Sequence, residues 1–334
     1  MRTRILVTGA GGAAAISYLQ AMQGPQFSLF AADMDPNATG LYMVGPSKRF
    51  LIPPAAAANY VQAILELCER EQIDILVPTV DMELLPISER RSEFEAAGVK
   101  LLLAPQGCLE LCLDKWLLMQ ACGPQLPVPQ SAVLTEGLDL STIPLPCIVK
   151  PREGAGGRGF KIVHTLADWM DQPRDGTMLI QEYLPGDEYS VDVLVDAEGH
   201  FKAAVPRLRM KVDSGVAVTA RTVRDEELMD LSERVARVIG LRFVGNIQWR
   251  RRADGRPMLL EVNPRFPGTM PLTVAAGVDM PRLSTASLMG EQLPAIAPFE
   301  EIAIVRRWQE IIVAPGAFDR VPKASASLRQ HRVA

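Results

Sequence analysis

A lysine and a glycine-rich loop in the middle of the chain could bind phosphate. Lys150 ends an apolar run and is followed by the loop 154–159, which holds Gly156, Gly157, Arg158 and Gly159. Glycines let backbone amides approach an anion closely, and an ammonium group adds positive charge. These residues form a candidate phosphate clamp, with a flexible hairpin tip as the alternative. Lys115 also lies in an apolar segment, where an unpaired ammonium group is costly to bury, so it belongs to the same hypothesis.

A second group of residues offers oxygen atoms that suit a magnesium ion. Asp254 and Gly255 predict a tight turn between two strands. Gln248 lies on the first strand, while Glu261 and Asn263 lie two residues apart on the second and therefore share a face. Magnesium favours sites with a few oxygen ligands and room for water and phosphate. The pattern predicts a metal site, with a solvated polar row as the alternative.

Basic residues alternate along another predicted strand. Arg207, Arg209 and Lys211 follow one another with period two, which predicts one basic row on a single face. Facing a cleft, such a row could bind a substrate carboxylate or a phosphate, whereas a solvated outer face is the alternative. Arg265, two residues after Asn263, could neutralise a phosphoryl group during its transfer.

Two further segments carry weaker signals. Residues 181–194 predict a strand, a Pro-Gly turn and a second strand, so that the backbone of residues 182–184 could meet an adenine ring and Glu188 could meet ribose hydroxyls. A plain strand-turn-strand is the alternative. Asp81 and Glu83 could lie near an incoming amine, or could simply cap the helix that follows them.

The elements that position these residues fall into two parts. Residues 1–105 alternate strands and helices, which implies a parallel sheet covered by helices. The first turn has Gly9, Gly11 and Gly12, but Ala14 breaks the dinucleotide-binding fingerprint, so a nicotinamide cofactor is only weakly indicated. Beyond a helical stretch at 108–123, the chain reads mostly as antiparallel strands.

The composition excludes several classes of function. A formal net charge of -4 argues against nucleic acid or an anionic membrane as the main partner. The five cysteines form no CxxC pair, and the three histidines leave little material for a histidine-based hydrolase. Because no apolar run approaches the roughly 20 residues that span a bilayer, we expect a cytoplasmic protein without a membrane partner.

In their order along the chain, these segments resemble the ATP-grasp superfamily, and most closely the ATP-grasp units of the carbamoyl phosphate synthase large subunit. The resemblance spans about residues 113–280. It rests on five motifs in register, which are DK at 114–115, VKP at 149–151, GAGGRG at 154–159, QEYLPGDEYSVDVL at 181–194 and EVNPRFPGT at 261–269.

The resemblance implies both a fold and a set of residue roles. The fold is α/β and α+β: a Rossmann-like pre-ATP-grasp domain at 1–105, a central lobe at 106–180 and a C-terminal lobe at 181–312. Separately, the composition of the C-terminus predicts a flexible tail at 313–334. The implied phosphate-binding groups are Lys115, Lys150 and Gly156 to Gly159; the adenine hinge is Glu182, Tyr183 and Leu184; the ribose carboxylate is Glu188; the metal ligands are Gln248, Glu261 and Asn263; and Arg265 steadies the reaction intermediate. We expect Arg207 beside Arg265, with Arg209, Asp81 and Glu83 as further substrate contacts.

The function implied is ligation of a small-molecule carboxylate to an amine through an acyl phosphate, with ATP and Mg²⁺ or Mn²⁺ as cofactors. Three alternatives stay open at this point: an enzyme that phosphorylates bicarbonate or carbamate, a non-catalytic ATP-binding regulator, and a nicotinamide-dependent oxidoreductase. A single ATP-grasp unit without a glutaminase segment argues against carbamoyl phosphate synthesis by this chain alone. The sequence leaves open which acid and amine react and whether the protein forms a homodimer.

Overall fold

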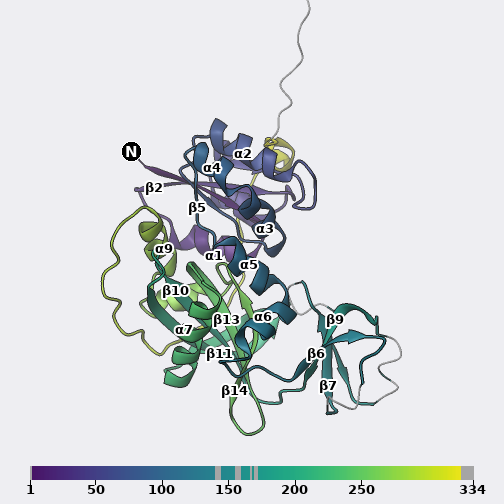
Figure 1. Ribbon diagram of the computed structural model, residues 1–334. Helices are drawn as coiled ribbons and strands as arrows, with labels where there is room; N and C mark the ends of the chain where they lie inside the picture. Colours follow the sequence, from purple (N-terminus) through teal and green to yellow (C-terminus); the bar gives the residue numbers. More distant parts are fainter. Residues whose placement is uncertain (1, 140–143, 155–158, 166–167, 169–171, 325–334) are drawn as a thin grey trace, which may run out of the picture. The chain divides into compact units, whose positions relative to one another are not determined.

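The computed structural model describes residues 2–139, 144–154, 159–165, 168 and 172–324. The chain divides into two compact units, coloured along the sequence in Figure 1. Unit 1 contains Met1–Leu102 with Trp308–Ala334, and unit 2 contains Leu103–Arg307. The expected mixed fold class, α/β followed by α+β, is confirmed by one parallel sheet in unit 1 and two antiparallel sheets in unit 2.

Unit 1 is built on a parallel sheet with the strand order β3-β2-β1-β4-β5. Its strands are β1 Thr3–Thr8, β2 Phe27–Asp33, β3 Arg49–Leu51, β4 Ile75–Val77 and β5 Lys100–Leu101. Its helices are α1 Ala13–Ala21, α2 Tyr60–Arg70, α3 Asp81–Glu89 and α4 Arg91–Ala96, with short 3-10 helices at Thr39–Met43 and Pro46–Lys48. The central strands are apolar and fully buried, as a sheet covered on both faces requires.

The C-terminal segment is also part of unit 1. It forms the 3-10 helix η5 Pro315–Arg320, and the N–H of Leu51 then donates to the carbonyl oxygen of Pro322 at 2.8 Å. The expectation of a flexible tail is therefore wrong for residues 313–324, because this segment supplies backbone partners to the edge strand β3. Residues 325–334 lie outside the described residues.

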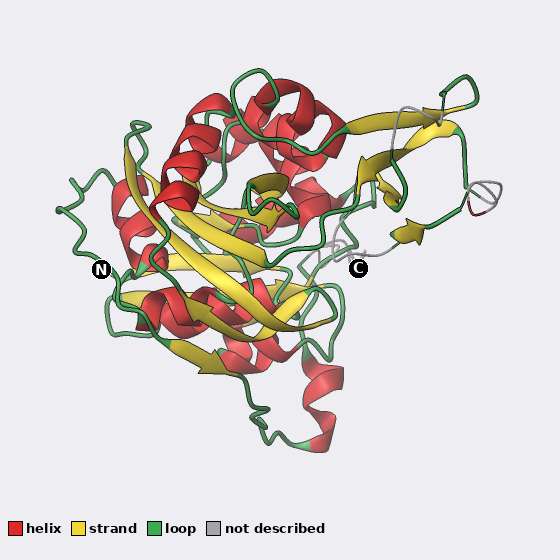
Figure 2. Ribbon diagram, turned by 90° about the horizontal axis from the view of Figure 1, so that it is seen from below, coloured by secondary structure: helices red, strands yellow, loops and turns green. Residues whose placement is uncertain are grey.

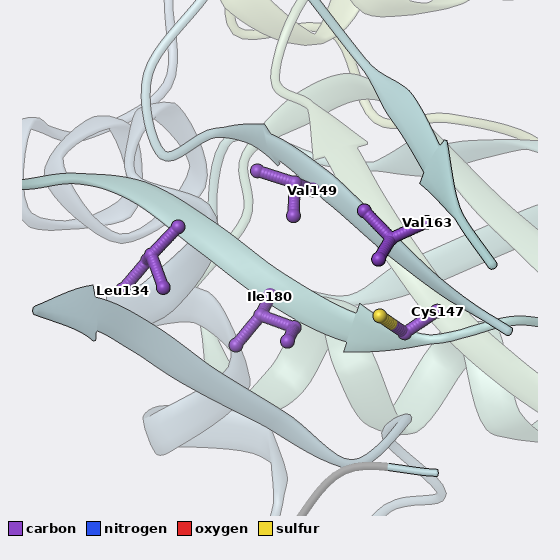
Figure 3. Close-up of a cluster of buried hydrophobic side chains, with 5 residues drawn as sticks. All are labelled: Leu134, Cys147, Val149, Val163 and Ile180. Carbon is purple, nitrogen blue, oxygen red and sulfur yellow. The ribbon is translucent and has the colours of Figure 1, made fainter. Parts of the chain in front are cut away.

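Unit 2 begins with two helices and a small antiparallel sheet in the order β6-β9-β7-β8. The elements are α5 Gln106–Leu113, α6 Lys115–Cys122, β6 Ser131–Thr135, β7 Cys147–Pro151, β8 Lys161–Val163 and β9 Asp175–Glu182. Figure 3 shows the apolar side chains that hold this sheet together, which are Leu134, Cys147, Val149, Val163 and Ile180. The helical stretch expected as one piece is two helices, because Asp114 accepts a hydrogen bond from the N–H of Trp116 at 2.8 Å and caps α6.

The larger sheet of unit 2 has the order β14-β13-β10-β11-β12-β15. Its strands are β10 Glu188–Val195, β11 Phe201–Asp213, β12 Val216–Thr222, β13 Phe243–Arg251, β14 Pro257–Asn263 and β15 Ala303–Val305. Its helices are α7 Glu226–Val238, α8 Met270–Ala275 and α9 Met280–Leu288, drawn in red beside the yellow strands in Figure 2. The fully buried Trp249 of β13 donates to Ser232 of α7 at 2.9 Å, so α7 packs on the sheet face opposite Gln248.

Candidate functional site

One face of the larger sheet carries the oxygen donors named from the sequence. Gln248 on β13 lies directly opposite Glu261 on β14, and Asn263 lies opposite Asn246. Directly opposite residues on neighbouring strands point to the same side of a sheet, so these side chains share a face, which we call the site face. The register brings Gln248, Glu261 and Asn263 together, and their role as metal ligands stays a prediction.

Two lysines lie beside this face. The Nζ atom of Lys115, at the start of α6, is 3.9 Å from a carboxylate oxygen of Glu261 and donates to the carbonyl oxygen of Gly154 at 2.9 Å. The Nζ atom of Lys150, on β7, donates to Oε1 of Gln181 at 2.9 Å. Helix α6 and strand β7 therefore bring both predicted phosphate-binding cations to the same place, where one carboxylate offsets two positive charges.

The protonation of Lys150 is sensitive to this environment. The pKa of its ammonium group is lowered to about 8, mainly by burial and also by the nearby charge of Lys115, while Glu261 and Glu188 act in the opposite direction. A bound anion stabilises the charged form of such a lysine and raises its pKa again. The site is therefore electrostatically prepared for a phosphate group.

Arginines surround the carboxylate of Glu188 on the same face. Arg209 lies 3.1 Å and Arg250 3.7 Å from its oxygens. Arg265, just beyond β14, donates to Oδ1 of Asn263 at 3.3 Å, next to the predicted metal ligands. Arg209 is largely buried in this arrangement, so its contact with a substrate stays a prediction.

Arg207 has a structural role, which corrects one expectation. Its side chain is 0% exposed and makes two hydrogen bonds to the carboxylate of Asp192, at 3.0 and 2.5 Å. The same carboxylate accepts from Asn246 at 2.7 Å and from Thr273, while Arg207 also donates to Thr269. The prediction of Arg207 facing a cleft was wrong because a buried guanidinium requires a buried anion, which Asp192 supplies.

The expected basic row is also interrupted. Arg209 lies opposite Ala220, but a bulge follows and Lys211 lies opposite Thr219, which belongs to the other face of the sheet. Lys211 is exposed, in agreement with a position outside the site. Period-two spacing fails here because one extra residue in β11 turns the side chain of Lys211 to the other face.

The predicted adenine hinge is anchored by polar contacts. Both carboxylate oxygens of Glu182 accept hydrogen bonds from Arg252, at 2.7 and 2.6 Å, and the backbone N–H of Glu182 donates to Gln130 at 2.9 Å. Leu184 is buried, and Tyr183 lines a cavity of about 500 Å³ together with Arg252. A second cavity of about 390 Å³ lies against α6. Neither cavity is lined by the site-face residues. The phosphate and metal roles of those residues therefore rest on strand register and side-chain contacts.

Part of the glycine loop is not described. Gly156, Gly157 and Arg158 lie outside the described residues. The two loop ends are defined: Gly154 has a φ of +115° and Gly159 a φ of +74°, both in the region that favours glycine. The phosphate-binding role of the loop stays a prediction.

The acidic residues of unit 1 serve its own backbone. The carboxylate of Glu83 is buried and accepts from the N–H groups of Thr79 and Val80, at 2.7 and 2.9 Å, and from the hydroxyl of Tyr60. The expectation that Glu83 meets an amine was wrong, because its oxygens already cap α3. Asp81 lies in the same first helical turn, and its contact with an amine stays a prediction.

The glycine turn of unit 1 is closed in the same way. Asp33, at the end of β2, accepts from the N–H groups of Gly11 and Asp35, at 2.7 and 2.9 Å. Gly9 has a φ of +64°, and a Cβ atom there would lie 2.3 Å from Val80. Tight packing and backbone strain therefore account for this glycine without a cofactor.

Comparison with known families agrees with this division of the chain. Residues 174–311 match the family described as "ATP-grasp in the biosynthetic pathway with Ter operon", and residues 5–102 match the "PylC-like, N-terminal domain" family. The resemblance to the ATP-grasp superfamily is confirmed for residues 174–311. The ATP-grasp match lies almost entirely within unit 2, and the PylC-like match lies within unit 1.

Relatives of this chain include much longer proteins, of which it spans about a sixth. It is 30% identical over 180 residues to the carbamoyl phosphate synthase large chain of Clostridium perfringens, covering 48% of this chain and 16% of the relative. Among solved structures, biotin carboxylase of Campylobacter jejuni aligns with a TM-score of 0.71 at 17% identity, covering 88% of this chain and 72% of the other. N5-carboxyaminoimidazole synthetase of Staphylococcus aureus, solved with ADP, aligns with a TM-score of 0.72 at 13% identity, covering 91% and 82%. These two structural likenesses show the fold.

Within the described residues of this chain, no helix is long and apolar enough to cross a membrane.

The site face and its surroundings contain residues that the sequence analysis did not single out. Asp192 pairs with Arg207, Gln181 accepts from Lys150, and Arg306 lies just after β15. The alternation of Glu188, Ser190 and Asp192 could have indicated Asp192, since period two puts all three on one face. No local signal marks Gln181 or Arg306, because both reach the site through long-range strand pairing.

Proposed function

We propose that the protein is an ATP-dependent ligase that activates a small-molecule carboxylate as an acyl phosphate and joins it to an amine or a similar nucleophile. One observation carries this proposal: Lys115 and Lys150 lie beside Glu261 on a face that also holds Gln248 and Asn263. Such a combination of cations and oxygen donors suits a metal-bound triphosphate. The ATP-grasp match supports the proposal independently.

In this mechanism the chain positions and neutralises charge. Lys115 and Lys150 bind phosphate oxygens, and Arg265 stabilises the negative charge that develops as the phosphoryl group moves to the substrate carboxylate. The nucleophile then attacks the acyl carbon and phosphate leaves. The backbone of Tyr183 and Leu184 binds the adenine ring, and Glu188, held by Arg209 and Arg250, accepts hydrogen bonds from the ribose hydroxyls.

The residues present fit a magnesium or manganese ion. Gln248, Glu261 and Asn263 offer amide and carboxylate oxygens, the ligand type that hard divalent cations prefer. They would hold the ion, which supplies positive charge to the phosphate oxygens when bound. A solved relative, a biotin carboxylase domain of Hydrogenobacter thermophilus, is described in complex with MgADP.

Bicarbonate is a second candidate for the carboxylate. The Hydrogenobacter structure is described with a bicarbonate anion, and the carbamoyl phosphate synthase relative shares 30% identity with this chain over 180 residues. An assay of ADP release with bicarbonate alone, and with a panel of organic acids and amines, separates the two candidates. Release that depends on an organic acid favours the ligase, and release with bicarbonate alone favours the second candidate.

Glu261→Ala tests the proposed site. We expect ADP release to fall to background, because this change removes a metal ligand and the only carboxylate near Lys115 among its described ion pairs. The matched control is Glu291→Ala, which changes an exposed carboxylate in the same unit and should keep full activity. Circular dichroism verifies that both variants are folded. Undiminished ADP release by folded Glu261→Ala would refute the site.

A further inference from the structure

Arg306 lies on the site face, although it comes from the opposite edge of the sheet. Its N–H donates to the carbonyl oxygen of Val218 at 3.0 Å, which extends the pairing of β15 with β12. Ile304, two residues earlier, lies opposite Ala220, and Ala220 lies opposite Arg209. The alternation of side chains along paired strands therefore points Arg306 to the same side as Arg209.

The guanidinium group of Arg306 reaches the loop that follows Arg265. Its Nη2 donates to the carbonyl oxygen of Gly268, and Arg207 donates to the next residue, Thr269. The buried Nε atom of Arg306 has no hydrogen-bond acceptor within the part of the chain that the structure describes. A charged donor is thus available at the end of the loop that begins with the proposed catalytic arginine.

Arg306 also differs from its neighbours in charge balance. Arg207 is paired with Asp192, and Arg209 is paired with Glu188. Across the described residues, no carboxylate oxygen lies within 4.0 Å of Arg306. Burial lowers the pKa of Arg306, and the positive charge of Arg207 adds to this. A half-buried cation without a partner carboxylate is costly, and an anion from a ligand would offset that cost.

We propose that Arg306 binds a second anionic group of the acid substrate, so that the substrate is a dianion: a dicarboxylic acid or a phosphorylated carboxylic acid. Arg265 serves the carboxylate that reacts, and Arg306 serves the anionic group that does not react. Arginine suits this task because its planar group binds carboxylate and phosphate oxygens in pairs. The inference rests on the proposed ligase function, since it names the substrate class for that site.

Binding measurements test this inference without requiring turnover. The full-length protein, saturated with a non-hydrolysable ATP analogue and Mg²⁺, is titrated calorimetrically with matched probes: succinate against propionate, and phosphoglycolate against glycolate. We expect a dianion to bind more tightly than its monoanionic match, and Arg306→Gln to weaken that dianion by about 10- to 100-fold, the range for losing hydrogen bonds to a charged group. Which dianion binds distinguishes a dicarboxylate from a phosphorylated acid.

The matched control is Arg307→Gln, which changes the exposed neighbouring arginine and should leave all affinities unchanged. Glutamine is shorter than arginine and gives up the contact to Gly268, so circular dichroism is used to verify that Arg306→Gln is folded. Equal binding of each dianion and its monoanionic match, or equal dianion affinity in Arg306→Gln and the parent protein, would overturn the inference. If dianion binding depends on Arg306 while no acid supports ADP release, the ligase function fails and the anion site stands.

Discussion

The two units use similar residues for different purposes. In unit 1 a glycine turn and two acids are satisfied by the chain itself: Asp33 accepts from Gly11, and Glu83 caps α3. In unit 2 the cations Lys115 and Lys150 contact neutral carbonyl oxygens at 2.9 Å, and the carboxylate near Lys115 is 3.9 Å away. Acids that cap backbone amides stabilise a fold, whereas cations with incomplete ion pairing are prepared for an anionic ligand.

The same distinction holds within unit 2. Arg207 and Asp192 lie on the site face, yet they neutralise each other completely in the core. Arg306 lies on that face without a carboxylate partner among the described residues. Residue type and location alone therefore do not identify a functional arginine, while its charge balance does.

The largest effect is expected from removing the carboxylate at the centre of the buried network. Asp192→Asn leaves Arg207 buried without a counter-charge, and we expect the free energy of unfolding to fall by about 3–5 kcal/mol. Urea unfolding followed by circular dichroism measures this loss. Asp230→Asn, which changes a carboxylate on an exposed part of α7, is the control. A loss as small as that of the control would mean that Arg207 is not held by Asp192 and is free for substrate.

Lys150→Met tests a cation that, unlike Arg207, is proposed to bind a ligand. We expect ADP release to fall by about 100- to 1,000-fold, because a preorganised charge on the transferring group is lost, while the free energy of unfolding is maintained or rises. Lys211→Met, on the exposed end of β11, should keep full turnover. Undiminished turnover in Lys150→Met would show that this cation does not serve a ligand, and the contrast between the two units would fail.

Much of the fold and of the candidate site could be predicted from the sequence, and the wrong predictions have physical causes. Strand-turn-strand patterns and the order of motifs place Gln248, Glu261 and Lys150 correctly in their elements, because those patterns are local. The bulge before Lys211 and the pairing of Arg207 with Asp192 depend on register and burial, which are set by distant strands. Glu83 could be interpreted either way from the sequence, since an acid in a first helical turn suits both capping and chemistry.

Glu83→Gln examines the acid of unit 1. The amide has one oxygen instead of two, so a hydrogen bond from Thr79, Val80 or Tyr60 is lost, and we expect unfolding of unit 1 to become easier by about 1–3 kcal/mol. ADP release per folded molecule should not change. Hydrogen exchange of α3 amides locates the stability loss. A fall in turnover at unchanged stability would show that Glu83 has a chemical role after all.

The smallest expected effect is a pH dependence of Mg·ATP affinity, which arises from Lys150 in unit 2. Because the pKa of Lys150 is lowered to about 8 in the folded chain, its side chain is fully charged only well below pH 8 and loses its charge as pH rises through that value. A bound phosphate favours the charged form and raises this pKa, so ATP binding takes up a proton near and above pH 8. Affinity for Mg·ATP should therefore fall as pH rises through 8, by at most about tenfold per pH unit for one linked proton.

Calorimetry in two buffers with different ionisation enthalpies measures the proton uptake directly. Lys150→Arg is the decisive comparison, because a guanidinium group stays charged throughout this range and should abolish both the uptake and the pH step. No such step is expected from Glu83 of unit 1, since burial raises its pKa, hydrogen bonds oppose that change, and its oxygens are already held by the chain. An unchanged pH step in Lys150→Arg would assign the titration to another group and would remove the electrostatic argument for Lys150 as a phosphate ligand.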